Sequence, residues 1–229
     1  MRLPGYALAL GVVLGCSGVD PNEVGVVALE VTVPSPATLE VGETLALSAR
    51  PVNAEGDSVA ATVTWAAADP TLTVNSSTGE VTGVSPGLGR VQASVGSLIS
   101  DPISFTVIAP ADTLIIAGDS VLTVLAGEVA SPAMVVRLES FSPPGPLSSR
   151  PVVFALTSPD PAITPPTVTF PGNQAADTVT TSADGSASVT LARVAGQVAP
   201  DTAIVAISAS RTRGAVVPGS GQRFLVLFQ

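Results

Sequence analysis

The sequence predicts an all-β protein that folds as two β-sandwiches in tandem, and three observations support this fold class. Val and Thr, which are stiff at χ1 and favour strands, are abundant along the chain. The 21 glycines and 21 prolines are scattered without a period, which is typical of frequent turns. Short β-prone runs bounded by turn residues begin near residue 26, and the pattern restarts near residue 110.

Residues 1–15 have the pattern of a helical signal peptide that is cleaved off. Arg2 supplies a positive charge, and an apolar run from Tyr6 to Gly15 follows it. This run is shorter than the roughly 20 apolar residues that a membrane-spanning helix needs. Residues 16–25 are polar and contain Gly and Pro, so they are expected to form a flexible tether.

The end of the apolar run contains the only cysteine of the chain, Cys16, which therefore cannot form an intramolecular disulfide. The stretch Val13-Leu14-Gly15-Cys16 resembles the lipobox of bacterial lipoproteins. The resemblance implies cleavage between Gly15 and Cys16, lipidation of the Cys16 thiol and attachment to a membrane through that lipid. Because Ser17 rather than Asp follows the cysteine, it also implies the outer membrane or the cell surface. The alternative is an ordinary signal peptide in which Cys16 has no such role.

The first folded unit is predicted to span residues 26–109. Its opening run alternates, with Leu29, Val31 and Val33 on one face, and further short β-prone runs follow. Trp65 is the only tryptophan of the chain, and its neighbours are small. We therefore expect Trp65 in the core between two sheets rather than on a binding surface.

Four pieces of this unit, in order, resemble the bacterial immunoglobulin-like domain, group 2. The resemblance implies an immunoglobulin-like sandwich with a tryptophan in its third strand. The four pieces are LEVGETLAL (39–47), VTW followed by an ADP turn (63–70), STGEVTGVSPG (77–87) and RVQASV (90–95).

The second folded unit is predicted to span residues 110–229. The Asp-Gly pair in residues 182–186 predicts a hairpin, and Phe224 to Phe228 form the expected closing strand. This half loosely resembles invasin-type immunoglobulin-like domains, which also implies a sandwich. The matching stretches are RPVVF (150–154), TSADGSA (181–187) and IVAI (204–207).

The composition excludes several classes of function. The net charge of −9 repels nucleic acid, so we expect no nucleic-acid partner. The chain has no histidine and one cysteine, so it lacks the residues of a Ser-His-Asp or Cys-His catalytic set and of a usual zinc site. We expect no catalytic residues, no cofactor and no enzyme activity. Carboxylate chemistry and calcium binding are still possible, with Asp101, Asp112 and Asp119 as candidate calcium ligands between the units.

The predicted function is that of a non-catalytic, lipid-anchored protein of the cell envelope that binds or adheres at the surface. A surface protein or a polysaccharide would be its partner, and the binding residues are not identifiable from the sequence. The Pro-rich segments 142–151 and 158–166 are the expected contact surface if the protein binds, although both also suit ordinary connections. The alternative function is a structural spacer or envelope assembly component without a ligand of its own.

Overall fold

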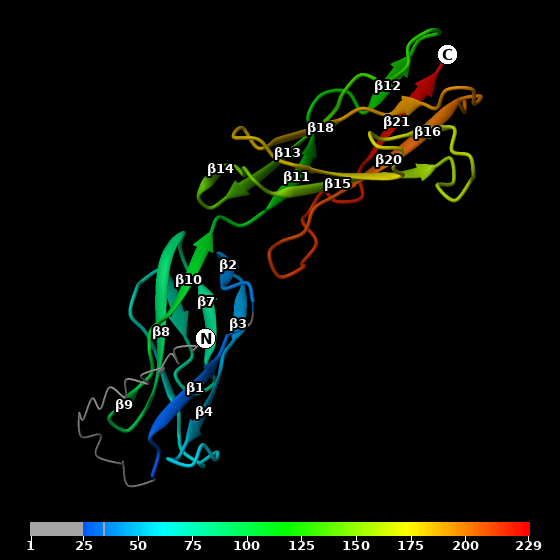
Figure 1. Cartoon of the computed structure of the whole chain (residues 1–229). Coiled ribbons are helices and arrows are strands. Elements are labelled where there is room, and N and C mark those ends of the chain that lie inside the picture. Colours follow the sequence, from blue (N-terminus) through cyan, green and yellow to red (C-terminus); the bar gives the residue numbers. More distant parts are fainter. Residues whose placement is uncertain (1–24, 34) are drawn as a thin grey trace, which may run out of the picture.

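The structure, a computed structural model, describes residues 25–33 and 35–229 and contains two units joined end to end (Figure 1). All regular elements in this part of the chain are β-strands. No helix among these residues is long and apolar enough to cross a membrane. The predicted signal peptide, Gly15 and Cys16, and nearly all of the predicted tether lie outside the described residues.

The first unit is a sandwich of two layers. In one layer the strand order is β2-β10-β8-β5, with β9 beside β8, and the other layer contains the pair β1-β4 and the three-stranded sheet β3-β7-β6. Its strands are β1 (Ala28–Thr32), β2 (Thr38–Glu40), β3 (Thr44–Ala46), β4 (Ser48–Val52), β5 (Thr64–Ala67), β6 (Leu72–Val74), β7 (Glu80–Gly83), β8 (Gly87–Val95), β9 (Leu98–Ile99) and β10 (Ile103–Ile108).

The core of the first unit forms around Trp65, which is 5% exposed on β5, as the sequence predicts. Gly79 allows this packing in two ways. Its φ of +72° suits glycine, and a Cβ there would lie 2.8 Å from Trp65 Nε1. The turn before β7 can therefore lie directly against the indole only because residue 79 has no side chain.

The second unit is a larger sandwich. One sheet has the order β12-β21-β20-β15-β17, and the facing sheet contains β11, β13, β14 and β18. Its strands are β11 (Thr113–Ile116), β12 (Val121–Val124), β13 (Met134–Phe141), β14 (Pro144–Pro146), β15 (Pro151–Ser158), β16 (Val168–Thr169), β17 (Ala176–Thr180), β18 (Ser186–Val189), β19 (Ala192–Arg193), β20 (Thr202–Ser208) and β21 (Arg223–Phe228).

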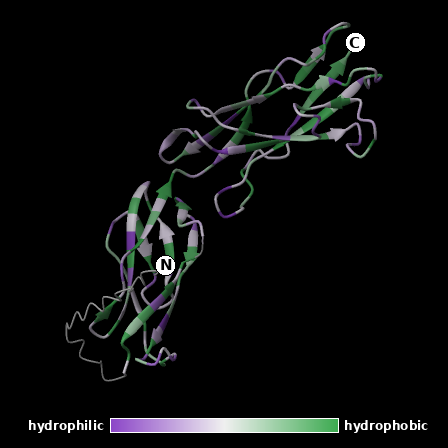
Figure 2. Cartoon of the chain, viewed as in Figure 1, coloured by the Kyte–Doolittle hydropathy of each residue, from purple (hydrophilic) through white to green (hydrophobic). Residues whose placement is uncertain are grey.

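The two units share a topological feature in their first strands. In the first unit β1 pairs antiparallel with β4, and β2 then crosses to pair parallel with β10. In the second unit β11 pairs antiparallel with β13, and β12 then crosses to pair parallel with β21. The long strands alternate buried residues with less buried ones, so apolar residues face the interior. Figure 2 shows the apolar residues along the strands of both units. The predicted all-β fold with two tandem immunoglobulin-like sandwiches is confirmed.

The predicted hairpin at residues 182–186 is only partly right. The turn is present, because Gly185 has a φ of +75° and its N–H donates to the Ser182 carbonyl at 2.9 Å. The strands on either side of the turn do not form one ladder, since β17 pairs with β15 and β18 pairs with β13 in the opposite sheet. The turn connects the two layers of the sandwich. The closing strand β21 is present, as predicted.

Candidate functional site

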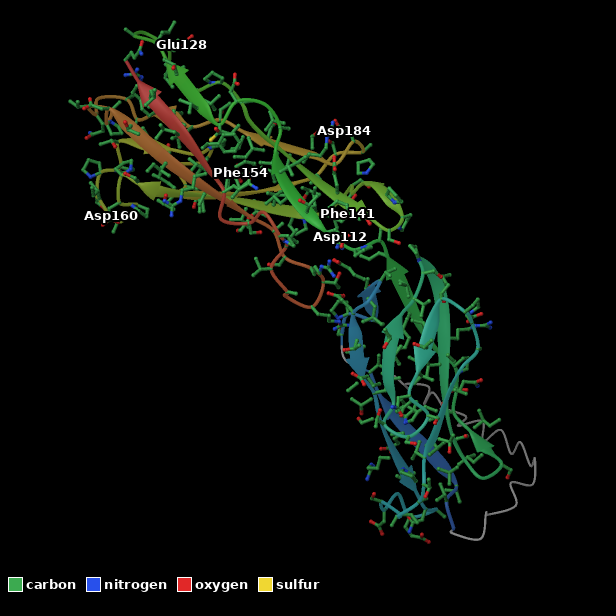
Figure 3. All side chains as sticks on the ribbon, turned by 180° about the vertical axis from the view of Figure 1, so that it is seen from behind. Asp112, Glu128, Phe141, Phe154, Asp160 and Asp184 are labelled. Carbon is green, nitrogen blue, oxygen red and sulfur yellow. The ribbon has the colours of Figure 1, made fainter. Side chains whose placement is uncertain are left out.

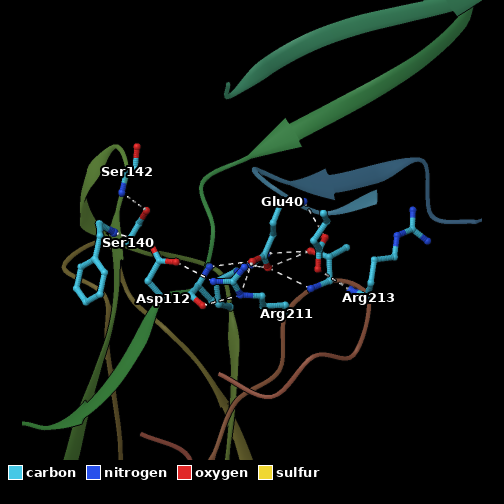
Figure 4. A network of polar contacts seen from close by, with 11 residues as sticks. Glu40, Asp112, Ser140, Ser142, Arg211 and Arg213 are labelled. Atoms are coloured by element: carbon cyan, nitrogen blue, oxygen red, sulfur yellow. Dashed lines mark hydrogen bonds and ion pairs between the residues drawn. The ribbon is translucent and has the colours of Figure 1, made fainter. Parts of the chain in front are cut away.

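The junction between the two units is the most densely connected polar site in the described part of the chain (Figure 4). The first unit contributes the end of β2 and the turn after it, with Glu40 and Glu43. The second unit contributes the loop between β20 and β21, which contains the sequence Arg211-Thr212-Arg213, and the start of β15. We call this set of residues, together with Asp112 and Arg150, the joint.

Glu40 is the centre of the joint, and its side chain is fully buried. Its Oε1 forms an ion pair with Arg150 and accepts hydrogen bonds from the Thr212 backbone N–H at 3.1 Å and the Thr212 hydroxyl at 3.2 Å. Its Oε2 accepts the Ala111 N–H at 2.8 Å and lies 3.8 Å from Arg211 Nε. A buried carboxylate is stable only when it is paired and hydrogen-bonded in this way.

Glu43 adds a second link between the units. Its Oε2 accepts the Glu40 backbone N–H at 2.8 Å, which holds the turn after β2 in place. Its Oε1 accepts the Arg213 backbone N–H at 3.1 Å from the second unit. The Arg213 guanidinium in turn donates to the carbonyls of Pro36 and Thr38 at 2.6 and 3.0 Å, so contacts run in both directions.

Asp112 connects the joint to the second unit itself. Its Oδ1 pairs with Arg211 at 2.7 Å, and its Oδ2 accepts the Phe141 N–H at 2.7 Å at the end of β13. Arg211 also donates to the Ala111 carbonyl at 3.0 Å. The connecting segment between the units is therefore fastened to both the loop 209–216 and the sheet.

The joint contains three carboxylates and three guanidinium groups, so its formal charges balance. Burial lowers the pKa of Arg150 from its ordinary value, and the nearby positive charge of Arg211 lowers it further. The pairing with Glu40 opposes both effects, because an opposite charge favours the charged form of a group. Arg150 and Arg211 both pair with Glu40, so removing Glu40 would leave partly buried positive charge without its buried partner, which is a situation that proteins tolerate poorly.

This arrangement connects the two domains through hydrogen bonds and an ion pair. Interfaces between domains of one chain ordinarily permit motion unless they are extensive. Here directional, charge-assisted hydrogen bonds connect backbone and side-chain groups that lie up to 177 residues apart in the sequence. The two sandwiches could therefore change their relative orientation only by breaking these contacts.

The structure does not support the calcium hypothesis for Asp101, Asp112 and Asp119. Among residues 25–33 and 35–229, no three His, Cys, Asp or Glu side chains gather as a metal site would require. Both carboxylate oxygens of Asp112 already have partners, namely the Arg211 guanidinium and the Phe141 N–H. Asp101 precedes β10, whose full length separates it from the joint, and Asp119 lies between β11 and β12. Spacing along the sequence could not reveal this separation.

The two Pro-rich segments do not form one contact surface. Strand β15 connects them, so segment 142–151 lies at the joint end of the second unit and segment 158–166 at the opposite end (Figure 3, where Phe141 and Asp160 mark these ends). The first segment is also not an open loop, because β14 within it pairs with β13 and Leu147 is buried in the core. Only the second segment remains a candidate binding loop.

Sequence reasoning missed the role of the joint residues, although two signals pointed to them. Glu40 and Glu43 lie in the stretch 39–47, where the sequence alone indicates only a strand and a turn. Arg211 and Arg213 form the densest basic stretch of a chain with nine arginines and no lysine. Neither signal identifies its partner, since the contacts join residues on different units.

No family model and no curated protein sequence matches the chain. Among solved structures, it is similar to the adhesin InvE of Yersinia pseudotuberculosis at 17% identity and a TM-score of 0.39, over 90% of this chain and 60% of that one. It is also similar to domains 4 and 5 of the S-layer protein SbsC at 17% identity and a TM-score of 0.34, over 89% and 98%. The fibronectin(III)-like modules of Clostridium thermocellum CbhA match at 13% identity and a TM-score of 0.40, over 87% and 94%. The TM-scores are below 0.5, so no conclusion about function rests on these similarities.

Proposed function

We propose that this protein is a lipid-anchored, non-catalytic component of the cell envelope that acts as a binding or adhesion module at the outer membrane or cell surface. The observation that carries the proposal is the joint, in which the fully buried Glu40 links the two sandwiches end to end. A stiff pair of domains attached at one end holds its other end at a fixed distance from the attachment point.

The anchor in this proposal is a lipid on Cys16, followed by the tether of residues 16–25. Several acyl chains on one residue would give stable attachment, because each buried CH₂ contributes about 0.8 kcal/mol. The first unit begins at the end that lies away from the joint (Figure 1). An anchor before this unit therefore places the second unit farther from the membrane, with the loops at its free end outermost.

A structural spacer without a ligand of its own is the second candidate function. The same joint favours it, because a spacer needs stiffness and no recognition surface. The two candidates differ at the free end of the second unit, which a spacer would not use. The partners proposed for the binding function are a surface protein or a polysaccharide.

Metabolic labelling with a palmitate analogue tests the anchor. Cells that express the wild-type chain should incorporate the label into this protein, and the Cys16→Ser variant should incorporate none. Ser17→Ala is the matched control, since it changes a neighbouring hydroxyl and leaves the thiol. Equal labelling of wild type and Cys16→Ser would overturn the anchor and the location that follows from it.

Adhesion of whole cells tests the surface role. Cells that carry the wild-type protein should bind a host-cell or biofilm surface better than cells that carry Cys16→Ser, which would release the protein. Digestion of intact cells with an added protease should remove the wild-type protein from the surface. A protein that resists digestion until the cells are opened would contradict exposure at the surface.

A further inference from the structure

Three loops at the end of the second unit opposite the joint form one connected surface, which we call the tip: residues 125–130, 159–167 and 194–201. Hydrogen bonds connect them directly, because Arg193 N–H donates to the Val129 carbonyl at 2.8 Å and Val194 N–H to the Thr167 carbonyl at 3.0 Å. The Arg193 guanidinium donates to the Leu125 carbonyl at 3.5 Å and lies 5.1 Å from the centre of the Phe228 ring. The loops are therefore held in place before any partner arrives.

Each loop of the tip presents an aliphatic side chain to solvent. Val129 is 75% exposed and Val198 is 88% exposed, and Leu125 and Ile163 are each about half exposed. Single exposed aliphatic residues need no explanation, but a group of them on connected loops is typical of an interaction site. These positions lie in turns, where polar residues would serve equally well for solubility.

The loop 159–167 of the tip, which contains Ile163, lines a pocket of about 120 Å³. Its apolar wall is formed by Pro159, Ile163, Pro166 and Val168, and the Thr167 side chain also lines it. The Thr167 Oγ1 is buried and has no hydrogen-bond partner among the described residues. A hydroxyl both donates and accepts, so it could bond a peptide N–H or C=O if the Thr167 side chain turns towards the pocket when a partner enters. Buried polar atoms without partners are rare in folded proteins, which makes this one a candidate ligand contact.

The charges around the tip are mainly negative. Glu128, Asp160 and Asp201 are exposed there (Figure 3 labels the first two), against the single guanidinium of Arg193. Glu128 and Asp160 each accept a backbone N–H from their own turns, at 2.8 and 2.9 Å, and remain exposed to solvent. The Arg193 charge is directed at backbone carbonyls and the Phe228 ring. The tip would therefore attract a partner with positive charge.

We propose that the tip is a docking surface for a protein that inserts an apolar side chain into the pocket and surrounds it with basic residues. This inference rests on the proposed binding function and names the surface that performs it. A polysaccharide fits less well, because sugar rings bind on aromatic faces and the exposed large side chains of the tip are aliphatic. The unpaired Thr167 hydroxyl, the aliphatic side chains and the acidic rim together suit a basic, apolar segment of polypeptide.

Selection from a displayed library of 12-residue peptides tests the proposal, with the whole mature chain in detergent micelles as the target. The enriched peptides should combine Leu, Ile, Val or Phe with Lys or Arg. The Val129→Ser/Val198→Ser variant should bind them at least roughly tenfold more weakly, because the contacts with two apolar side chains are lost. Leu88→Ser is the matched control, since Leu88 is 74% exposed on the first unit, and it should leave binding unchanged.

Two further variants separate the contributions of charge and pocket. Asp160→Asn/Asp201→Asn should weaken binding about threefold and reduce its salt dependence, while Glu55→Gln on the first unit should not. Thr167→Val is nearly isosteric and should weaken the binding of the peptides. It should not lower the melting temperature, because the buried hydroxyl has no hydrogen-bond partner to lose.

Several results would overturn the proposal. Peptides that bind the Val129→Ser/Val198→Ser variant as well as wild type would show that the tip is not the docking surface, and the same holds if no peptide is enriched. Sugars from a glycan array that bind wild type and not this variant would replace the protein partner with a polysaccharide. If palmitate labelling is normal, any of these results overturns the docking surface and leaves the proposed lipid anchor standing. If the labelling fails, the lipid anchor is overturned and the docking surface is not affected.

Discussion

The two units have the same architecture, but their hydrophobic cores differ in size and composition. Among the described residues, the buried core cluster of the first unit contains ten residues around Trp65, whereas that of the second contains twenty-four, including Phe154, Phe170 and Phe224. The aromatic residues in the cluster of the first unit are Trp65 and Phe105. The cluster of the second unit contains four phenylalanines. One substitution should therefore affect the first unit more than a comparable one affects the second.

Trp65→Ala is the most direct test of this difference between the two cores. Truncating a buried tryptophan lowers the free energy of unfolding by about 3–5 kcal/mol, and a ten-residue core has little reserve. Differential scanning calorimetry should show the transition of the first unit shifted far down or lost, with that of the second unit retained.

Two controls complete the Trp65 experiment. Leu88→Ser, on the exposed face of the same unit, should change its stability by less than about 0.5 kcal/mol. Phe154→Leu should lower only the transition of the second unit, and by less than Trp65→Ala lowers the first. An equal loss of both transitions in Trp65→Ala would show that the two cores are not separate units of stability.

Glu40→Ala tests whether the joint fixes the relative orientation of the two units. The substitution leaves Arg150 and Arg211 without their buried partner, and such a loss costs about 3 kcal/mol, here in the contact between the units. We expect the orientation of the units to broaden while each core remains folded. Distances between spin labels on Glu55→Cys and Glu128→Cys, measured in a Cys16→Ser background, should change from a narrow to a wide distribution.

The control for the joint is Glu30→Ala, which removes an exposed ion pair with Arg50 inside the first unit. Such surface pairs contribute little, so the distance distribution should remain narrow. Glu40→Gln should fall between these two, because the amide keeps the shape and loses the charge. A narrow distribution in Glu40→Ala would mean that the joint does not determine the stiffness of the pair.

The sequence predicted the features that depend on local patterns. Alternation of apolar residues identified the strands, and the small neighbours of Trp65 indicated its burial correctly. The Asp184-Gly185 turn was also predicted, but not the two sheets that it connects, because a turn residue does not specify the partners of its flanking strands. The role of Glu40 could not be predicted, since its partners lie 71 to 172 residues away on the other unit.

Gly79→Ala tests the close packing of residue 79 against Trp65 and removes no side chain from the first core. The new Cβ would lie 2.8 Å from the Trp65 indole, at a φ of +72° that alanine adopts poorly. We expect a loss of about 1–3 kcal/mol from strain and overpacking together. Urea unfolding followed by fluorescence measures it directly, because Trp65 is the only tryptophan and reports on the first unit alone.

Gly56→Ala is the matched control for Gly79→Ala. Its φ of +85° imposes a similar backbone strain, but no atom lies within 4 Å of the Cβ that would be added. The loss should therefore be only about 1 kcal/mol, and the fluorescence spectrum should stay unchanged. Equal losses in the two variants would mean that the contact with Trp65 adds nothing to the backbone strain.

The smallest expected effect is a pH dependence confined to the second unit. Hydrogen bonds from the Ser182 hydroxyl and from the Ser186 hydroxyl and backbone N–H lower the pKa of Asp184 from 3.8 to about 2. The ionised carboxylate therefore stabilises the folded turn fully above the unfolded pKa of 3.8, and this contribution is lost as the pH falls towards 2. Asp184→Asn should reduce the drop in the melting temperature of the second unit between pH 5 and about pH 2, whereas Asp57→Asn in the first unit should leave that drop unchanged. If wild type and Asp184→Asn lost the same number of degrees over this interval, the turn would not hold its carboxylate in the ionised form, and the pH sensitivity of the second unit would have to arise elsewhere in its sandwich.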